Sequence, residues 1–96
     1  MTATHFESAA VHTLTPMVRW VFHRDGFAIT CEVDAHGTGS YDVALIPHWN
    51  PSAAVIERFN RPLRALERHV SIAQRLRDDG WVVVDHAIPN YVGTAA

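Results

Sequence analysis

The residues of this chain that are best suited to chemistry are its histidines and arginines. Its 96 residues include seven His, and all eight basic residues are Arg. A zinc site needs three or four converging His, Cys or carboxylate ligands, yet no His-x₃-His or His-Glu-x-x-His spacing occurs. We therefore predict no metal site and no cofactor, and interpret the histidines as scattered surface residues. A metal- or ligand-binding enzyme is the second alternative function, and its candidate residues are His23, His36, His48 and Glu32.

Four arginines fall in one sector of a predicted helix: Arg61, Arg64, Arg68 and Arg75. A basic helix face of this kind can follow a phosphate backbone. However, residues 50–79 hold six Arg and four acidic residues, and the whole chain has a formal net charge of −2. Nucleic-acid-binding domains are usually far more basic. We therefore favour a solvated face, and nucleic-acid binding through these four arginines is the first alternative function.

The remaining motifs indicate structure rather than catalysis. Cys31 is the only cysteine, which excludes an internal disulfide, and its place on the core face of a strand predicts a buried, inert thiol. Residues 36–40 contain two glycines but join two strands and open no helix. We interpret them as a hairpin connection rather than a phosphate-binding loop. We predict no catalytic residues and favour a chain that is not an enzyme.

Two alternating apolar runs, residues 17–23 and 27–34, flank the dipeptide Asp25-Gly26. This dipeptide predicts a two-residue type I′ hairpin turn. Both central residues of such a turn need a positive φ, which Asp-Gly adopts readily. A two-residue loop fixes the register of the hairpin. The register places apolar residues opposite one another and Arg19 opposite Glu32; the apolar pairs are Phe22–Ile29, Trp20–Cys31 and Val18–Val33.

A third alternating run, residues 41–47, extends the hairpin into a three-stranded antiparallel meander. Asn50-Pro51 then predicts the start of a long helix over residues 51–79, interrupted at Pro62. Its apolar stripe has helical spacing and consists of Phe59, Leu63, Leu66, Val70 and Ala73.

The end of the helix carries its own signal. Gly80 and Trp81 predict a Schellman motif in which Trp81 reaches back to Leu76, and residues 81–86 predict a fourth strand at an edge of the sheet. The predicted fold class is therefore α+β, with two layers: the antiparallel meander and the Pro-interrupted helix that packs on it.

Length and composition predict one small domain over residues 1–96, with residues 1–15 and 89–96 as loose tails. A capping box at Thr4 and Glu7 makes a short N-terminal helix the alternative to a frayed tail. The first residues lack a basic segment and no apolar run is long enough to span a bilayer, so we expect a cytoplasmic protein without a membrane partner. Arg without Lys, together with 13 Ala, is typical of a GC-rich bacterial genome.

The apolar surface predicted for the helix is wider than a small sheet can cover. Either the N-terminal segment covers it or a second subunit does, and the interface residues would then be Trp49, His69, Ile72 and Leu76. Our leading interpretation is a small non-catalytic protein–protein interaction module that forms a homodimer. Self-association is the expected contact, a different protein partner is the alternative, and nucleic acid is the disfavoured one.

Overall fold

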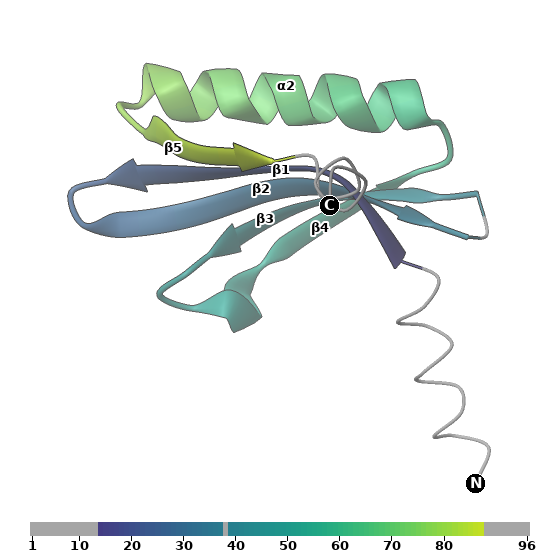
Figure 1. The fold of residues 1–96 in the computed structure, drawn as a ribbon, viewed down its shortest axis with the longest axis horizontal. Coiled ribbons are helices and arrows are strands. Elements are labelled where there is room, and N and C mark those ends of the chain that lie inside the picture. The colour runs from purple at the N-terminus through teal and green to yellow at the C-terminus, as the bar shows by residue number, and fades with distance from the viewer. Residues whose placement is uncertain (1–13, 38, 88–96) are drawn as a thin grey trace, which may run out of the picture.

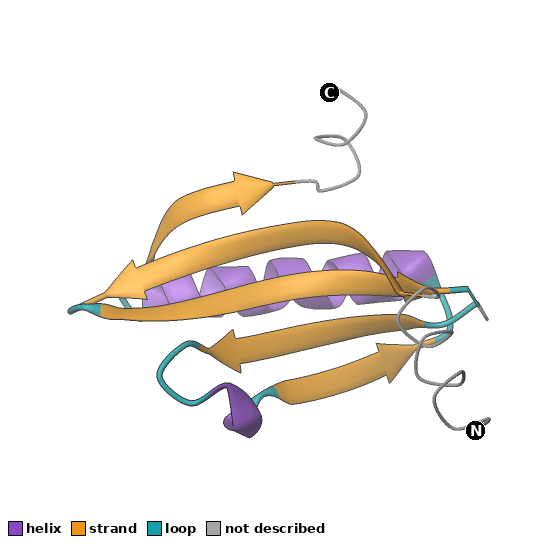
Figure 2. Cartoon of the chain, turned by 60° about the horizontal axis from the view of Figure 1, so that its bottom comes forward, coloured by secondary structure: helices purple, strands orange, loops and turns teal. Residues whose placement is uncertain are grey.

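The computed structural model describes residues 14–37 and 39–87, in which five strands form one antiparallel sheet (Figure 1). The strands lie in the order β4-β3-β2-β1-β5, so β4 and β5 are the edges. One face of the sheet carries the helix α2 (Figures 1 and 2). The predicted α+β class, with a meander packed by a helix, is thus confirmed. The elements are β1 (Leu14–Arg24), β2 (Phe27–His36), β3 (Tyr41–Pro47), the short 3₁₀ helix η1 (Pro51–Ala53), β4 (Val55–Phe59), α2 (Pro62–Asp78) and β5 (Val82–Ala87).

The β1–β2 hairpin forms in the predicted register. Asp25 and Gly26 have φ angles of 51° and 84°, as a type I′ turn requires. Each predicted apolar pair is present, from Phe22 opposite Ile29 onward, and Arg19 lies opposite Glu32 with an Nε–Oε1 distance of 3.7 Å. The turn residues, the apolar alternation and the cross-strand charges therefore all favour the same register.

The start of the predicted helix is wrong, because the helix begins at Pro62 rather than at residue 51. Residues 51–53 form a single 3₁₀ turn, and β4 then pairs with β3 at the edge of the sheet. Arg61 has an extended backbone, which is the conformation favoured immediately before proline, and Pro62 occupies the first turn of α2. The Asn60-Arg61-Pro62 step thus separates a strand from a helix instead of two helical pieces.

The buried face of α2 also differs from the predicted stripe. Leu63 and Val70 are 65% and 64% exposed, whereas Ala65, His69 and Leu76 are buried together with Ala73. Phe59 belongs to β4 and not to the helix. The buried face of α2 is therefore centred on positions that the sequence predicts beside the stripe. His69 holds this face of α2 against the sheet, because its Nε2 lies 3.2 Å from the carbonyl oxygen of Cys31 on β2.

The end of α2 matches its prediction. The amide of Trp81 donates to the Leu76 carbonyl at 2.9 Å, the amide of Gly80 donates to the Arg77 carbonyl at 2.9 Å, and Gly80 has a φ of 93°. These are the two hydrogen bonds of a Schellman motif. The chain then enters β5, which runs antiparallel to β1 at the edge of the sheet.

The core lies between α2 and the face of the sheet that α2 covers. Its largest fully buried side chains are Phe22, Val33, Val43 and Cys31. The predicted N-terminal helix, residues 1–13 and the predicted tail 89–96 lie outside the described residues. The end predicted for the N-terminal tail is wrong, because β1 begins at Leu14 and residues 14 and 15 pair with β2. Within the described part of the chain, no helix is long and apolar enough to cross a membrane.

Candidate functional site at the hairpin end of the sheet

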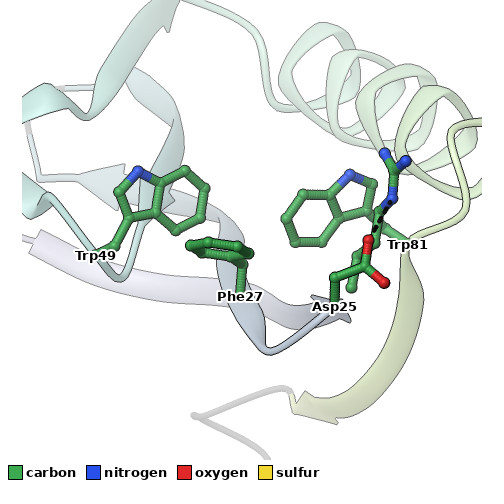
Figure 3. Close-up of a pocket in the computed structure, with 5 residues that line it drawn as sticks. Asp25, Phe27, Trp49 and Trp81 are labelled. Atoms are coloured by element: carbon green, nitrogen blue, oxygen red, sulfur yellow. Dashed lines mark ion pairs between the residues drawn. The ribbon is translucent and has the colours of Figure 1, made fainter.

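Three aromatic side chains from distant parts of the sequence meet at the end of the sheet beside the β1–β2 turn (Figure 3). Phe27 is the first residue of β2, Trp49 lies between β3 and η1, and Trp81 lies between α2 and β5. Together with Arg24 and Asp25 they line a pocket of about 360 Å³. This volume is near the lower end of the range for small-ligand sites. We call this cavity the aromatic pocket.

The local structure around each ring explains its position. Phe27 faces the same side as Ile29, the core side, but it lies at the open end of the hairpin and is 52% exposed. The His48 amide donates to the Ala28 carbonyl at 2.9 Å, which extends the β2–β3 contact and places Trp49 beside Phe27. The Schellman turn places Trp81 on the other side. The hairpin end, the His48–Ala28 hydrogen bond and the Schellman turn thus bring the three rings to one cavity.

The rings form walls of two orientations. Phe27 and Trp49 have centroids 5.2 Å apart with an interplanar angle of 77°, an edge-to-face pair. Trp49 and Trp81 are nearly parallel, at 17°, with centroids 6.5 Å apart. Figure 3 shows the two indoles side by side, with the Phe27 ring seen edge-on between them. Trp49 is 55% exposed, so this apolar surface is open to a binding partner.

Polar groups occur at the rim of the aromatic pocket. Arg24 Nε and Asp25 Oδ2 are 3.5 Å apart, and this exposed ion pair leaves the rim without net charge. Within the described part of the chain, the indole N–H groups of Trp49 and Trp81 form no hydrogen bond. The lining side chains therefore offer three donor groups, two indole N–H groups and one guanidinium, and one acceptor group, the Asp25 carboxylate.

The structure divides the four arginines proposed for nucleic acid. Arg61 precedes the helix rather than lying on it, and only Arg64, Arg68 and Arg75 share a flank of α2. Arg68 Nε donates to Glu57 Oε1 on β4 at 2.7 Å, so this charge is matched within the chain. The remaining stripe is shorter and less basic than the sequence predicts.

The proposed interface residues are not all on the surface. His69 and Leu76 are 4% and 9% exposed and belong to the core, so the prediction that they are interface residues is wrong. They lie on the face of α2 that packs on the sheet, together with the buried Ala65 and Ala73. Ile72 is partly buried against the same core, and Trp49 alone of the four is largely exposed.

The histidines considered for a metal site lie in separate contacts. His48 Nε2 is 2.6 Å from the Thr30 hydroxyl, whereas His36 Nε2 is 2.8 Å from Asp42 Oδ2. Over residues 14–37 and 39–87, no group of three or more His, Cys, Asp or Glu side chains is placed to hold a metal ion. Cys31 is fully buried, and burial raises its pKa to about 12, so the thiol stays protonated.

The sheet face away from α2 carries an ionic network that sequence reasoning missed. Arg58 Nε donates to Asp42 Oδ1 at 2.7 Å, and this hydrogen bond, followed by that of His36, holds the pKa of Asp42 below its usual value despite burial. Asp34 lies opposite Asp42, and its pKa is raised to about 7 by burial and by the neighbouring Glu32. The register of β2 and β3 was the available signal, because it places two carboxylates opposite each other. The sequence predicts Arg58 on the helix, so it does not indicate Arg58 as the partner of these carboxylates.

The aromatic pocket was missed for a similar reason. The sequence predicts Trp49 as an interface residue and Trp81 as part of the helix end, but no local pattern relates either to Phe27. The signal that could have united them is that all three follow or precede turns at the same end of the predicted sheet.

No protein-family model matches this chain, and no curated protein or solved structure is significantly similar to it.

Proposed function

We propose that this chain is a non-catalytic cytoplasmic interaction module whose aromatic pocket binds a short segment of a partner protein. The observation that carries the proposal is the convergence of Phe27, Trp49 and Trp81 from three chain segments around one open cavity. Leaving aromatic rings half-exposed to water is unfavourable for the free protein, and a partner that covers them would remove this cost. Trp is also among the residues most enriched at the positions that contribute most of the binding energy in protein interfaces.

The chemistry of the lining supports binding rather than catalysis. General acid–base catalysis needs a titratable group that is free to transfer a proton to the substrate. Among the described residues, the only carboxylate that lines the aromatic pocket is that of Asp25, whose side chain is 81% exposed and lies in an ion pair with Arg24. The other lining groups are three hydrocarbon-rich rings, which contribute contact area and orientation.

The test is selection from a random peptide library displayed on phage. We expect wild-type protein to enrich peptides that share a motif, and we expect those peptides to lose binding to the Trp49→Ala and Phe27→Ala variants. Val70→Ala is the matched control, because Val70 is also largely exposed but lies on α2, outside the aromatic pocket. No enrichment, or enriched peptides that bind the Trp49→Ala variant equally well, would falsify the proposed function.

A second surface favours self-association. The edge strand β4 exposes Val55 and Ile56, by 58% and 60%. The outer side of an edge strand presents unpaired backbone groups that can pair with another strand, and apolar side chains strengthen such pairing. We propose that two copies pair through their β4 edges, so that the homodimer interface lies on the strand and not on the helix flank expected from the sequence.

Sedimentation velocity over a concentration series tests this contact. A dimer that the Ile56→Lys variant dissociates and the Val70→Lys variant does not would support it, because both variants add one charge at an equally exposed apolar position. A strict monomer at tens of micromolar would rule out the dimer, and the peptide-binding proposal would be unaffected.

A further inference from the structure

Arginines line the side of α2 that faces the edge strand β4. Arg68 Nε donates to Glu57 Oε1 on β4 at 2.7 Å, and this contact fixes the direction in which that side of the helix points. Arg64 lies four residues before Arg68, and Arg75 lies seven residues after it, which are the spacings of residues on one helix face. Arg61 lies between the end of β4 and the start of α2. We call these four arginines the arginine flank.

Three residues of the arginine flank carry charges that the fold does not match. Within the described part of the chain, no ion pair includes Arg61, Arg64 or Arg75, and all three are exposed. Glu67 and Asp78 follow Arg64 and Arg75 by three residues on α2, but neither is paired with them in the structure. A free guanidinium matches the geometry of a phosphate group and binds it through two parallel hydrogen bonds.

Pairing of two copies through β4 brings two arginine flanks together. Every strand pair of the sheet is antiparallel, and antiparallel pairs are the more stable kind, so we expect the two β4 strands to pair in this way. Identical antiparallel strands in one sheet are related by a two-fold axis perpendicular to the sheet. Such an axis leaves both helices on the same face, where each α2 turns its arginine flank toward the other copy (Figure 1).

The two flanks together form a site that neither copy holds alone. The sequence disfavours nucleic acid because acidic residues dilute the charge of one chain, yet electrostatic attraction is screened beyond about 8 Å at physiological salt. The local charge of the flank is therefore more important than the net charge of the chain. Two copies supply six unmatched arginines, three from each, along the line where the β4 strands meet.

The length of this line fits a run of phosphates. β4 has five residues, so two paired strands extend for about 17 Å. Successive nucleotides of one DNA strand rise about 3.4 Å along the helix axis, and the line therefore spans about five of them. A phosphate backbone also offsets the repulsion between the arginines of the two copies, which face each other across the pairing line.

We infer that a homodimer paired through β4 binds the phosphate backbone of nucleic acid with the arginine flanks of both copies. This inference rests on the β4 pairing that we propose above, and it adds a ligand to that pairing. It is independent of the aromatic pocket, which lies at the hairpin end of the sheet. Arginines that contact phosphates do not read bases, so the binding is independent of sequence.

The experiment titrates the full-length protein into a fluorescently labelled DNA duplex of 12 base pairs and follows the anisotropy. Each phosphate contact contributes about −0.9 to the slope of log K against log salt, so six contacts give about −5 between 50 and 200 mM salt. A duplex of scrambled sequence should bind equally well. Poly-glutamate is the comparison for acidic polypeptides, and binding to it that equals or exceeds binding to the duplex would overturn the inference.

The Arg64→Gln variant tests whether both copies contribute. It removes one arginine from each copy and two from the dimer, so the slope should become less negative by about 1.8, whereas a site on one copy would lose about 0.9. Arg19→Gln is the matched control, because it removes the same charge from the sheet face away from α2 and should leave the slope unchanged. A change of about 0.9 in Arg64→Gln, or no change, would overturn the inference.

Sedimentation velocity separates this inference from the proposals on which it rests. A wild-type dimer that does not bind the duplex would overturn the inference and leave the β4 pairing in place. A chain that stays monomeric with and without the duplex would overturn both, and peptide binding by the aromatic pocket would be unaffected. Ile56→Lys should dissociate the dimer and weaken duplex binding although it adds a positive charge; equal or tighter binding would also overturn the inference.

Discussion

Asp34 provides a quantitative test of the electrostatics of this fold. Its side chain is 9% exposed on the sheet face away from α2, where it faces Glu32 on its own strand and Asp42 on β3. Burial, the hydrogen bond with Glu32 and the negative charges of both neighbours raise its pKa from 3.8 to about 7, while His36 acts in the opposite direction. Ionised Asp34 is therefore a cost to the folded state.

The sign of the pH dependence follows from this shift. The folded state binds the proton more tightly than the unfolded state, so between the two pKa values the free energy of unfolding falls as pH rises. Below the unfolded value both states are protonated and the cost disappears. Above the pKa of the folded state, the whole difference between 3.8 and about 7 applies, which sets a ceiling of about 4 kcal/mol on the cost. At pH 5 the ceiling on the cost of ionised Asp34 to the folded state is about 2 kcal/mol.

The perturbation is Asp34→Asn, which keeps the shape and keeps a donor for Glu32. Because the variant cannot ionise, its stability relative to wild type should be greater at pH 8 than at pH 5 by about 2 kcal/mol. Urea unfolding followed by tryptophan fluorescence measures both values. Asp25→Asn is the matched control, since the Asp25 side chain is 81% exposed and Asn also tolerates a positive φ. An equal stability difference at the two pH values, or a larger one at pH 5, would refute the reasoning.

Three further predictions concern individual residues. Gly80→Ala should lower the free energy of unfolding by about 1 kcal/mol in urea titrations, because Gly80 has a φ of 93°; an unchanged stability would contradict the Schellman assignment. Cys31 should resist a thiol reagent at pH 8 in native protein and react fully in urea, and rapid native labelling would show that the thiol is accessible. His69→Gln should lose less stability than wild type between pH 7 and pH 5, because burial lowers the pKa of His69 and its protonation on acidification favours unfolding; parallel losses would contradict this.

Local sequence rules correctly predicted the turn between β1 and β2 and the C-terminal end of α2. The Asp25-Gly26 turn and the Gly80-Trp81 helix end depend on backbone conformations that few residue types adopt, so the residues alone specify them. The hairpin register follows from the first of these and from the apolar alternation on both sides of it. These features need no knowledge of the rest of the fold.

The region between β3 and α2 could not be predicted in the same way. Phe59 is four residues before Leu63, as on one face of a helix. It is also four residues after Val55, an even spacing that places both on the same face of a strand. Only pairing with β3 decides between the two, and in that pairing Arg58 donates to the carboxylate of Asp42, which His36 also contacts. The missed ionic network and the misplaced helix face are thus consequences of one tertiary contact.

The aromatic pocket results from a mismatch of lengths between the two layers. Gly80 ends the helix beside the hairpin turn, since a Cβ at this position would lie 3.7 Å from Arg24 Nε. Phe27 is the last core-side position of β2 at that end, and it lies where the cover given by α2 stops. The core therefore opens there, and Trp49 and Trp81 surround the opening without closing it. If the pocket were only an imperfect core end, replacing Trp49 would affect stability and leave peptide binding unchanged; the proposed function requires the opposite ranking.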